Sequence, residues 1–349
     1  MNDLANPMGT DGFEFVEFAA PDAAQLHALF KAFGFTAIAR HKSINATLYR
    51  QGDSNFIVNE EPNSFAAAFA KRHGPCSCGF AIRVKDARAA HARATALEAD
   101  MVQSPQGVPV DAPHIKGIGG SLLYLVDQYG DNGSAYGDFE PIEGIDQNPQ
   151  GFGLTYIDHL THNVFHGNME QIANFYERLF NFREIRYFDI KGAQTGLVSK
   201  AMTSPDGKVR IPINESSDDK SQINEYLREY DGEGIQHIAL FTDNIYQTVE
   251  KMREQGVKFL DTPDTYYDVI DQRIPSHNED VDGMRRNKIL IDADQETGKQ
   301  LLLQIFTETN IGPIFFEIIQ RKGNEGFGEG NFTALFEAIE RDQERRGVL

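Results

Sequence analysis

Apolar and polar positions along the chain follow one pattern that recurs four times. In each copy an alternating stretch rich in Val, Ile and Phe is followed by a stretch with apolar residues at helical spacing. The copies begin near residues 13, 79, 158 and 236. Two of the predicted helices, over 87–99 and 244–255, directly follow Asp86 and Asp243, and polar residues of this kind favour helix starts. The repetition predicts duplicated modules, each with one helix and several strands.

The pattern also predicts how the modules are grouped. Further alternating stretches at 45–50 and 304–307 predict strands. The segment 140–153 is rich in Gly, Pro and polar residues, so we expect a domain boundary there, with domains over 1–150 and 151–349. The chain of 349 residues is long enough for two domains of ordinary size. A long helix is predicted at the end of the chain from the i, i+3, i+4, i+7 spacing of Phe332, Leu335, Phe336 and Ile339.

Charge and cysteine content narrow the function classes. Lys and Arg number 33 and Asp and Glu number 52, a formal charge of −19, which disfavours nucleic acid and anionic membranes as partners. An anionic substrate would need a local cation. The sequence has neither a signal-like start nor an apolar run of about 18 residues, so we expect a cytoplasmic protein. Cys76 and Cys78 lack a second pair that would complete a zinc site, and we expect two reduced thiols.

Two histidines and one glutamate are the main candidates for chemistry. His159, His237 and Glu317 each lie in a short apolar, strand-like run, 78 and 80 residues apart. Two imidazoles and one carboxylate can occupy one face of an octahedral Fe(II) and leave three positions open. A carboxylate in an apolar strand requires a cation, so a structural ion pair with Arg or Lys remains the alternative. His162 is three residues from His159, and a regular strand directs the two side chains to opposite faces.

The repeat provides an internal comparison for these candidates. Aligning the two halves places Phe80 at the position of His237 and Leu125 at the position of Glu317. Near the equivalent of His159 the first half offers residues 13–16, none of which is histidine. We therefore expect a single site, in the C-terminal half.

The strings around the three candidates resemble the 4-hydroxyphenylpyruvate dioxygenase family. The most specific ones are IDH (157–159), RIPINE (210–215), GIQHIAL (234–240), FEIIQRKG (316–323) and GFGEGNF (326–332). The resemblance covers nearly the whole chain. It implies an α+β vicinal-oxygen-chelate fold, like that of glyoxalases and extradiol dioxygenases, with four βαβββ modules that form two open β-barrels. It also implies Fe(II) as the cofactor, with His159, His237 and Glu317 as its ligands.

The resemblance further implies the reaction and its substrate contacts. The iron enzyme would convert 4-hydroxyphenylpyruvate and O2 to homogentisate and CO2 in tyrosine and phenylalanine catabolism, with no separate 2-oxoglutarate. Asn214, Gln222 and Gln304 are the expected catalytic side chains, and we expect a homo-oligomer, a dimer or a tetramer. Gln236 fits least well, because strict alternation would direct it away from the face of His237. The full set of expected substrate contacts is Ser199, Asn214, Gln222, Gln236, Gln304, Phe306, Phe315, Phe327 and Phe332.

Several alternatives remain open from the sequence. The last helix and the Gly-rich turn before it are interpreted as a lid, and the alternative is a packed helix without a gating role. A 4-hydroxymandelate synthase would share the fold, iron and substrate, although Pro212 and Phe332 match the ring-hydroxylating enzyme. An extradiol dioxygenase would use the same ligands with a further acid–base histidine. A non-catalytic binding protein of the same fold would not need the three ligands.

Overall fold

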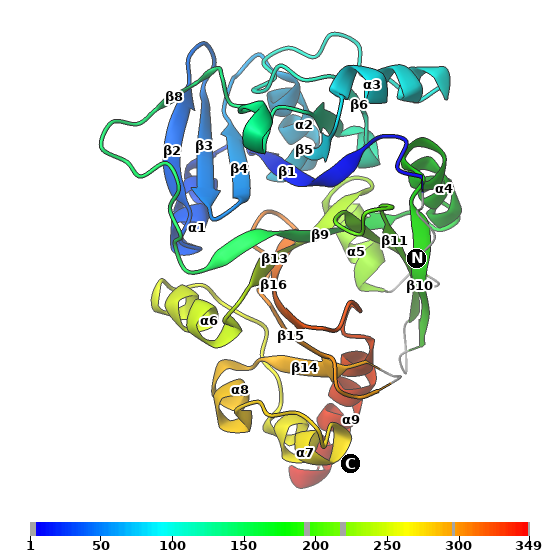
Figure 1. The fold of residues 1–349 in the computed structure, drawn as a ribbon. Helices are drawn as coiled ribbons and strands as arrows, with labels where there is room; N and C mark the ends of the chain where they lie inside the picture. The colour runs from blue at the N-terminus through cyan, green and yellow to red at the C-terminus, as the bar shows by residue number, and fades with distance from the viewer. Residues whose placement is uncertain (1–4, 192–195, 217–220, 295–296, 348–349) are drawn as a thin grey trace.

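The computed structural model describes residues 5–191, 196–216, 221–294 and 297–347. These residues form two eight-stranded curved sheets, one from each half of the chain, which lie one above the other in Figure 1. The strands of the first sheet, in spatial order, are β6 (His114–Lys116), β7 (Leu122–Val126), β5 (Cys76–Val84), β1 (Thr10–Ala19), β4 (Ser54–Asn59), β3 (Ala46–Gln51), β2 (Thr36–His41) and β8 (Phe139–Pro141). The strands of the second sheet are β10 (Arg183–Lys191), β11 (Gly196–Thr203), β12 (Arg210–Ser216), β9 (Leu154–Val164), β13 (Gly234–Thr242), β16 (Phe315–Lys322), β15 (Leu301–Phe306) and β14 (Leu290–Ala293).

Helices connect the strands and cover the outer faces of the sheets (Figure 1). Four of them follow the first strand of a module, and the others lie in the connections and at the end of the chain. The α-helices are α1 (Ala24–Ala32), α2 (Phe65–His73), α3 (Ala87–Ala96), α4 (Met169–Phe180), α5 (Gln222–Glu229), α6 (Ile245–Glu254), α7 (Ile270–Arg273), α8 (Val281–Asn287) and α9 (Glu329–Arg345). Short 3-10 turns are η1 (Ile118–Gly120), η2 (Gly130–Asn132) and η3 (Asp264–Val269). Of the helices in the described part of the chain, none has the length and apolar character needed to cross a bilayer.

The two sheets share one connectivity, which confirms the duplicated fold. In the first sheet, β1 is parallel to β4 and antiparallel to β5, and β5 is parallel to β7. In the second sheet, β9, β12, β13 and β16 repeat these relations. The second module has one strand fewer beside β5 than the fourth has beside β13, because β8 pairs with β2 at the opposite edge of the sheet.

The predicted helix start after Asp86 is confirmed, and in the fourth module the helix begins one residue later than predicted, at Ile245 after Asn244. The Asp86 carboxylate accepts a bond from the backbone N–H of Ala89 at 2.8 Å. The Asn244 side-chain oxygen accepts one from the N–H of Gln247 at 3.1 Å. Each bond satisfies a backbone N–H of the first helical turn, which has no partner inside its helix. The capping residue therefore fixes where the strand ends and the helix begins.

Alternation along the strands separates a core face from an inner face. On β16, Phe316 belongs to the large core between the sheets and contacts Phe33 of the N-terminal half, with ring centroids 4.8 Å apart. The alternate residues, which include Glu317, lie on the inner face of the second sheet. His162 also lies on the core side, where its Nε2 is 2.7 Å from the Tyr176 hydroxyl. The predicted separation of His162 from His159 is therefore confirmed.

The paired strands correct the sequence comparison between the halves. Phe80 is part of the core between the sheets, whereas His237 lies on the inner face, so these two are not equivalent. The residue that pairs with both neighbouring strands at the equivalent point is Ala81 in β5 and Ala239 in β13, five residues before Asp86 but four before Asp243, so the simple alignment is offset by one residue. Leu125 likewise faces the core and is not the counterpart of the inner-facing Glu317.

The strand register instead places Phe15, Gly79 and Tyr124 at the positions of the three candidate ligands. The rings of Phe15 and Tyr124 lie 5.1 Å apart on the inner face of the first sheet. The Tyr124 hydroxyl donates to the buried Glu17 carboxylate at 2.7 Å. None of the three side chains is a metal ligand of the expected kind, and the described residues contain one cluster of potential ligands, in the second sheet. The expectation of a single site in the C-terminal half stays a prediction, with Phe15, Gly79 and Tyr124 as the equivalent residues of the first half.

The final helix forms as predicted, but a different face of it is buried. Phe332 and Ile339 are about half exposed, whereas Ala334 and Ala338 are buried. The side chain of Phe336 lies outside the described part of the chain. Ala334 and Ala338 allow α9 to approach η3 and β14 closely. Of the predicted stripe, Leu335 is partly buried against the core, whereas Phe332 and Ile339 are not.

Candidate metal centre

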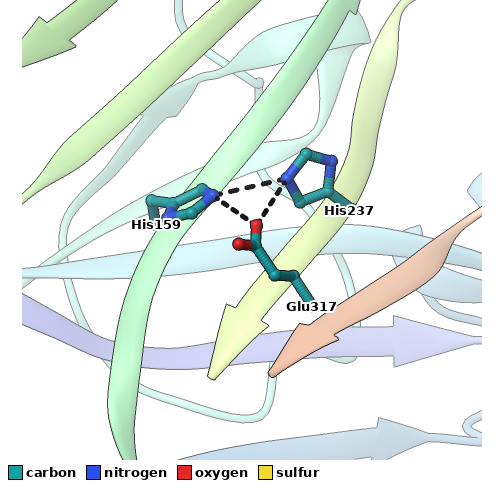
Figure 2. Close-up of side chains that lie close together, drawn as sticks. All are labelled: His159, His237 and Glu317. Atoms are coloured by element: carbon teal, nitrogen blue, oxygen red, sulfur yellow. Dashed lines mark hydrogen bonds and ion pairs between the residues drawn. The ribbon is translucent and has the colours of Figure 1, made fainter. Parts of the chain in front are cut away.

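Three neighbouring strands bring two imidazoles and one carboxylate together (Figure 2). His159 lies on β9, His237 on β13 and Glu317 on β16, and β13 is the middle strand of the three. The two Nε2 atoms are 3.3 Å apart, and Glu317 Oε2 lies 3.1 Å from that of His159 and 3.4 Å from that of His237. The side chains are 2%, 12% and 3% exposed, respectively. Residues separated by about 80 positions thus meet at one buried point.

A β-bulge precedes each histidine and fixes the orientation of its ring. Between β9 and β13 the register shifts at Asp158 and again at Gln236, so each of these residues is the extra one in its strand. The Asp158 carboxylate lies 2.8 Å from Nδ1 of His159, and Oε1 of Gln236 lies 3.0 Å from Nδ1 of His237. With Nδ1 held in this way, the Nε2 atom of each ring remains as the ligand atom directed at the centre.

Asp158 is itself held by a buried arginine. Arg321, on β16, donates from Nε and Nη2 to the two Asp158 oxygens, both at 2.8 Å. The side chains are 0% and 5% exposed. Burial alone would raise the pKa of Asp158, but the Arg321 guanidinium and the bond to His159 lower it well below its usual range. Neither residue was predicted as part of the site, although both are charged residues within apolar strand runs, Asp158 on β9 and Arg321 on the strand of Glu317.

The electrostatic balance at the centre suits a cation. Burial lowers the pKa of His237, and although burial acts in the same direction on His159, the carboxylates of Glu317 and Asp158 raise the pKa of that ring. Burial would raise the pKa of Glu317, but the two imidazoles lower it, so the carboxylate is ionised. Within the described part of the chain, Glu317 Oε1 accepts no hydrogen bond and no Lys or Arg forms an ion pair with this carboxylate.

The donor set fits a divalent metal ion. Ligands about 2.1 Å from one ion are separated by roughly 3.0–3.4 Å from each other, which is the range of the separations among these atoms. One nitrogen-rich face made of two imidazoles and one carboxylate is typical of non-haem Fe(II) sites. The orphaned Glu317 oxygen supplies a further reason to expect a cation, because an unpaired buried carboxylate oxygen is costly.

Aromatic rings surround the three ligand side chains. Phe315 stacks on His237 with centroids 4.9 Å apart, and Phe306 contacts the same imidazole edge-on at 6.1 Å. Phe327, in the turn before α9, lies edge-on to His159 at 5.2 Å. The surroundings of the centre are therefore largely apolar, which favours exclusion of water and burial of an aromatic ligand.

Two of the expected polar contacts form a short chain that reaches the centre. Asn214 Nδ2, on β12, donates to Gln236 Oε1 at 3.3 Å, and that oxygen is the one beside His237. The expectation that alternation would direct Gln236 away from this face is wrong, because the bulge interrupts the alternation. Gln236 and Asn214 therefore lie on the inner face, beside His237.

The other expected substrate contacts lie on β11, β15, α5 and α9, and some of them are far more exposed than others. Ser199 is buried on β11 directly opposite Asn214. Gln304 is buried on β15, and its Oε1 accepts from Asn331 Nδ2 of α9 at 3.3 Å. Gln222 is exposed in the first turn of α5, and Phe332 is half exposed on α9. The structure does not bring these last two side chains to the buried centre, and their contact with substrate stays a prediction.

Comparisons with known proteins agree with this architecture. Residues 4–140 match the family described as hydroxyphenylpyruvate dioxygenase, N-terminal, and residues 156–274 match the glyoxalase, bleomycin resistance protein and dioxygenase superfamily. A mutant 4-hydroxymandelate synthase from Streptomyces coelicolor has a similar structure, with a TM-score of 0.81, 25% identity and coverage of 96% of this chain and 100% of that chain. Fold and superfamily are thus established by both sequence and structure.

Full-length relatives specify the family. Hemolysin VllY of Vibrio vulnificus is 59% identical over 100% of this chain and 99% of its own length. The 4-hydroxyphenylpyruvate dioxygenase of Pseudomonas aeruginosa is 58% identical over 99% of this chain and 97% of its own length. A further protein of that name, from a Pseudomonas strain, is 54% identical over 99% of this chain and 98% of its own length. The chain therefore belongs to the 4-hydroxyphenylpyruvate dioxygenase family.

Proposed function

We propose that this protein is an Fe(II)-dependent dioxygenase that converts 4-hydroxyphenylpyruvate and O2 to homogentisate and CO2. Its family membership and its full-length relatives support this reaction. The observation that carries the proposal is the buried meeting point of His159, His237 and Glu317, where one carboxylate oxygen lacks a partner among the described residues. A two-histidine, one-carboxylate face leaves positions for a chelating oxo acid and for O2.

The three side chains would hold the iron, and the rest of the chain would orient the substrate. Bound Fe(II) supplies two things: a chelation site for the 2-oxo acid group and a site for activating O2. It also provides the local positive charge that an anionic substrate needs near a chain with a formal charge of −19. His159 and His237 contribute neutral Nε2 atoms because Asp158 and Gln236 hold their Nδ1 atoms.

Aromatic side chains would pack against the ring of the substrate, and polar side chains would bind its phenol group. The rings of Phe306, Phe315 and Phe327 keep water from the centre and offer faces to the phenyl ring. Polar groups within an apolar pocket fix the position of a phenol. We assign this role to Ser199, Asn214, Gln236 and Gln304, with Asn214 and Gln304 as the catalytic side chains. For the exposed Gln222 and the half-exposed Phe332, a contact with the substrate stays a prediction from the sequence.

Two alternatives predict different products from the same mixture. The structural likeness to a 4-hydroxymandelate synthase favours 4-hydroxymandelate as the second candidate product. A binding protein of this fold would give no product. The test is to load the protein with Fe(II), add 4-hydroxyphenylpyruvate in air and identify the aromatic product by chromatography and mass. Homogentisate supports the proposal, 4-hydroxymandelate moves the assignment to the synthase, and unchanged substrate contradicts catalysis.

The proposal extends to the organisation of the protein. We propose two structural domains, 1–150 without a metal and 151–349 with the metal centre. A homo-oligomeric assembly, as a dimer or tetramer, and a cytoplasmic location remain predictions from the sequence.

A further inference from the structure

A single arginine connects the metal centre to the turn that leads into α9. Arg321 uses Nε and Nη2 on Asp158, and its Nη1 donates to the backbone carbonyls of Asn324 at 3.0 Å and Gly326 at 2.6 Å. Its guanidinium also lies 5.7 Å from the centre of the Phe327 ring. All these partners surround a side chain that is 5% exposed.

This arrangement bridges strands that are not neighbours. Arg321 lies four residues after Glu317 on β16, and residues four apart in a strand share a face. Asp158 lies beside His159 on β9, and β13 separates the two strands. The ion pair therefore links β16, which carries Glu317, to β9, which carries His159. It does so across β13, which carries His237.

The other end of Arg321 holds the turn before α9, which contacts the metal centre. Asn324 and Gly326 flank the start of the turn, and the ring of the next residue, Phe327, lies edge-on to His159 at 5.2 Å. Three donors in a rigid planar fork set the distance between Asp158 and these carbonyls. A shift of the turn would therefore move His159, both through its ring contact with Phe327 and through the ion pair between Arg321 and Asp158.

We propose that Asp158 and Arg321 form a positioning pair that orients His159 toward the metal and couples the metal centre to the 324–327 turn. The inference rests on the proposed function for the identity of the reaction, but not for the effect on metal binding. Neither residue touches the substrate in this proposal; both act through His159 and Phe327. His237 is held differently, by the neutral amide of Gln236, so the two histidines are expected to respond differently to loss of their partners.

The test compares two arginines that are both bound to carboxylates, with side chains 5% exposed for Arg321 and 16% exposed for Arg83. Arg321→Lys keeps the positive charge beside Asp158 but loses the planar fork. Arg83→Lys is the matched control, because Arg83 donates to Glu14 and, at 2.8 and 2.9 Å, to Asp53 in the first sheet, away from the metal centre. The full chain is titrated with Co(II) against a competing chelator, and the absorption spectrum of the Co(II) protein is recorded.

For Arg321→Lys we expect Co(II) binding about 10- to 100-fold weaker and a changed absorption spectrum, because partners of metal-binding histidines contribute effects of this size. With iron, the same variant is expected to consume more O2 per homogentisate formed. Arg83→Lys should match the unsubstituted protein in all three measurements. A wild-type Co(II) affinity and spectrum in folded Arg321→Lys would overturn the proposal.

A second variant keeps the test decisive if Arg321→Lys does not fold. The double substitution Asp158→Asn with Arg321→Gln removes both charges together and leaves no unpaired buried ion. The same weakening of Co(II) binding is expected, and unchanged binding would count equally against the pair. The Co(II) readout needs no turnover, so a failure of the proposed reaction would appear as a missing product with the metal effect still present.

Discussion

Glu317 is a buried carboxylate whose ion-pair partners in the described structure are two imidazoles and whose second oxygen accepts no hydrogen bond there. We predict that Glu317→Gln weakens metal binding by at least about 100-fold, since it removes a charged ligand rather than a supporting partner. Turnover should be lost while the far-ultraviolet circular dichroism stays unchanged. The measurement is bound iron per protein after desalting.

Glu17 provides the matched control for this substitution. It is also a buried carboxylate, on the inner face of the first sheet, where burial raises its pKa despite bonds from Asn59 and Tyr124. Glu17→Gln should retain iron and activity. Equal iron loss in both variants would contradict the assignment of Glu317 as a ligand, because it would point to a general effect of removing a buried acid.

The pKa of His159 predicts how metal binding depends on pH. Burial works against protonation, but Glu317 and Asp158 raise the pKa of this ring above its ordinary value of 6.5 in the metal-free protein. A metal ion must displace that proton, so affinity is full above the raised pKa and falls as the pH drops through it. We expect a loss of about tenfold per pH unit below that point, measured with Co(II) and a chelator between pH 5.5 and 8.5 in roughly half-unit steps. A flat profile would show that no ligand titrates there.

Residue identities in the sequence predicted the three candidate ligands but not their supporting partners. His159, His237 and Glu317 stand out because polar groups interrupt apolar runs. The side-chain direction of Gln236 depends on a bulge, which strict alternation does not reveal. Asp158 also lies at a bulge. It pairs with Arg321, which is 163 positions away in the sequence. Partners at that separation follow from the folded register rather than from local pattern.

At the scale of single elements, the turn before α9 determines how the last helix meets the inner face. Gly328 has a φ of 78°, and a Cβ added there would lie 1.6 Å from Gln304 Oε1. Gly328→Ala should therefore displace Gln304 and break its bond to Asn331. We predict a loss in kcat/KM of about 100-fold, the effect of a misplacement near 1 Å.

Substitution of Gly207 is the control that distinguishes backbone strain from this steric clash with Gln304. Gly207 has nearly the same φ, 76°, and no atom lies within 4 Å of an added Cβ. Gly207→Ala should cost only about 1 kcal/mol of stability, with normal kinetics. If both substitutions leave kcat/KM unchanged, neither Gln304 nor the turn orients the substrate, and the packed-helix interpretation of α9 is favoured.

The existence and order of a few elements could be predicted from the apolar pattern, and the points it missed have physical causes. Helices α3 and α6 start where Asp86 and Asn244 cap them. The buried face of α9 was only partly predictable from its large apolar residues, because Leu335 packs against the core but Ala334 and Ala338 are its most buried apolar residues. From the repeat alone, β8 would be assigned to the second module. Its actual place beside β2 depends on pairing between segments that are distant in the sequence.

At the scale of the whole molecule, one apolar core extends across both halves of the chain. Phe316 of β16 contacts Phe33 at 4.8 Å and also approaches Phe56, both from the N-terminal half. We predict that Phe316→Ala lowers the free energy of unfolding by about 3–5 kcal/mol. Because the two sheets share this core, unfolding followed by fluorescence and by circular dichroism should show coincident transitions.

An exposed ring serves as the control for this prediction. Phe165 is 47% exposed, so Phe165→Ala should change stability by no more than about 0.5 kcal/mol. Two separate transitions in Phe316→Ala, with only one of them shifted, would contradict a shared core and would indicate that the halves fold independently.

The central claim is that His159, His237 and Glu317 hold the iron at which 4-hydroxyphenylpyruvate meets O2. The most direct measurement is a reaction of the Fe(II)-loaded protein with 4-hydroxyphenylpyruvate under ¹⁸O2, beside Glu317→Gln, with mass analysis of the product. We expect homogentisate that carries both labelled oxygen atoms, one on the ring and one in the carboxylate, and no homogentisate from the variant. Labelled homogentisate from Glu317→Gln at the wild-type rate, or no homogentisate from the unsubstituted protein, would contradict it.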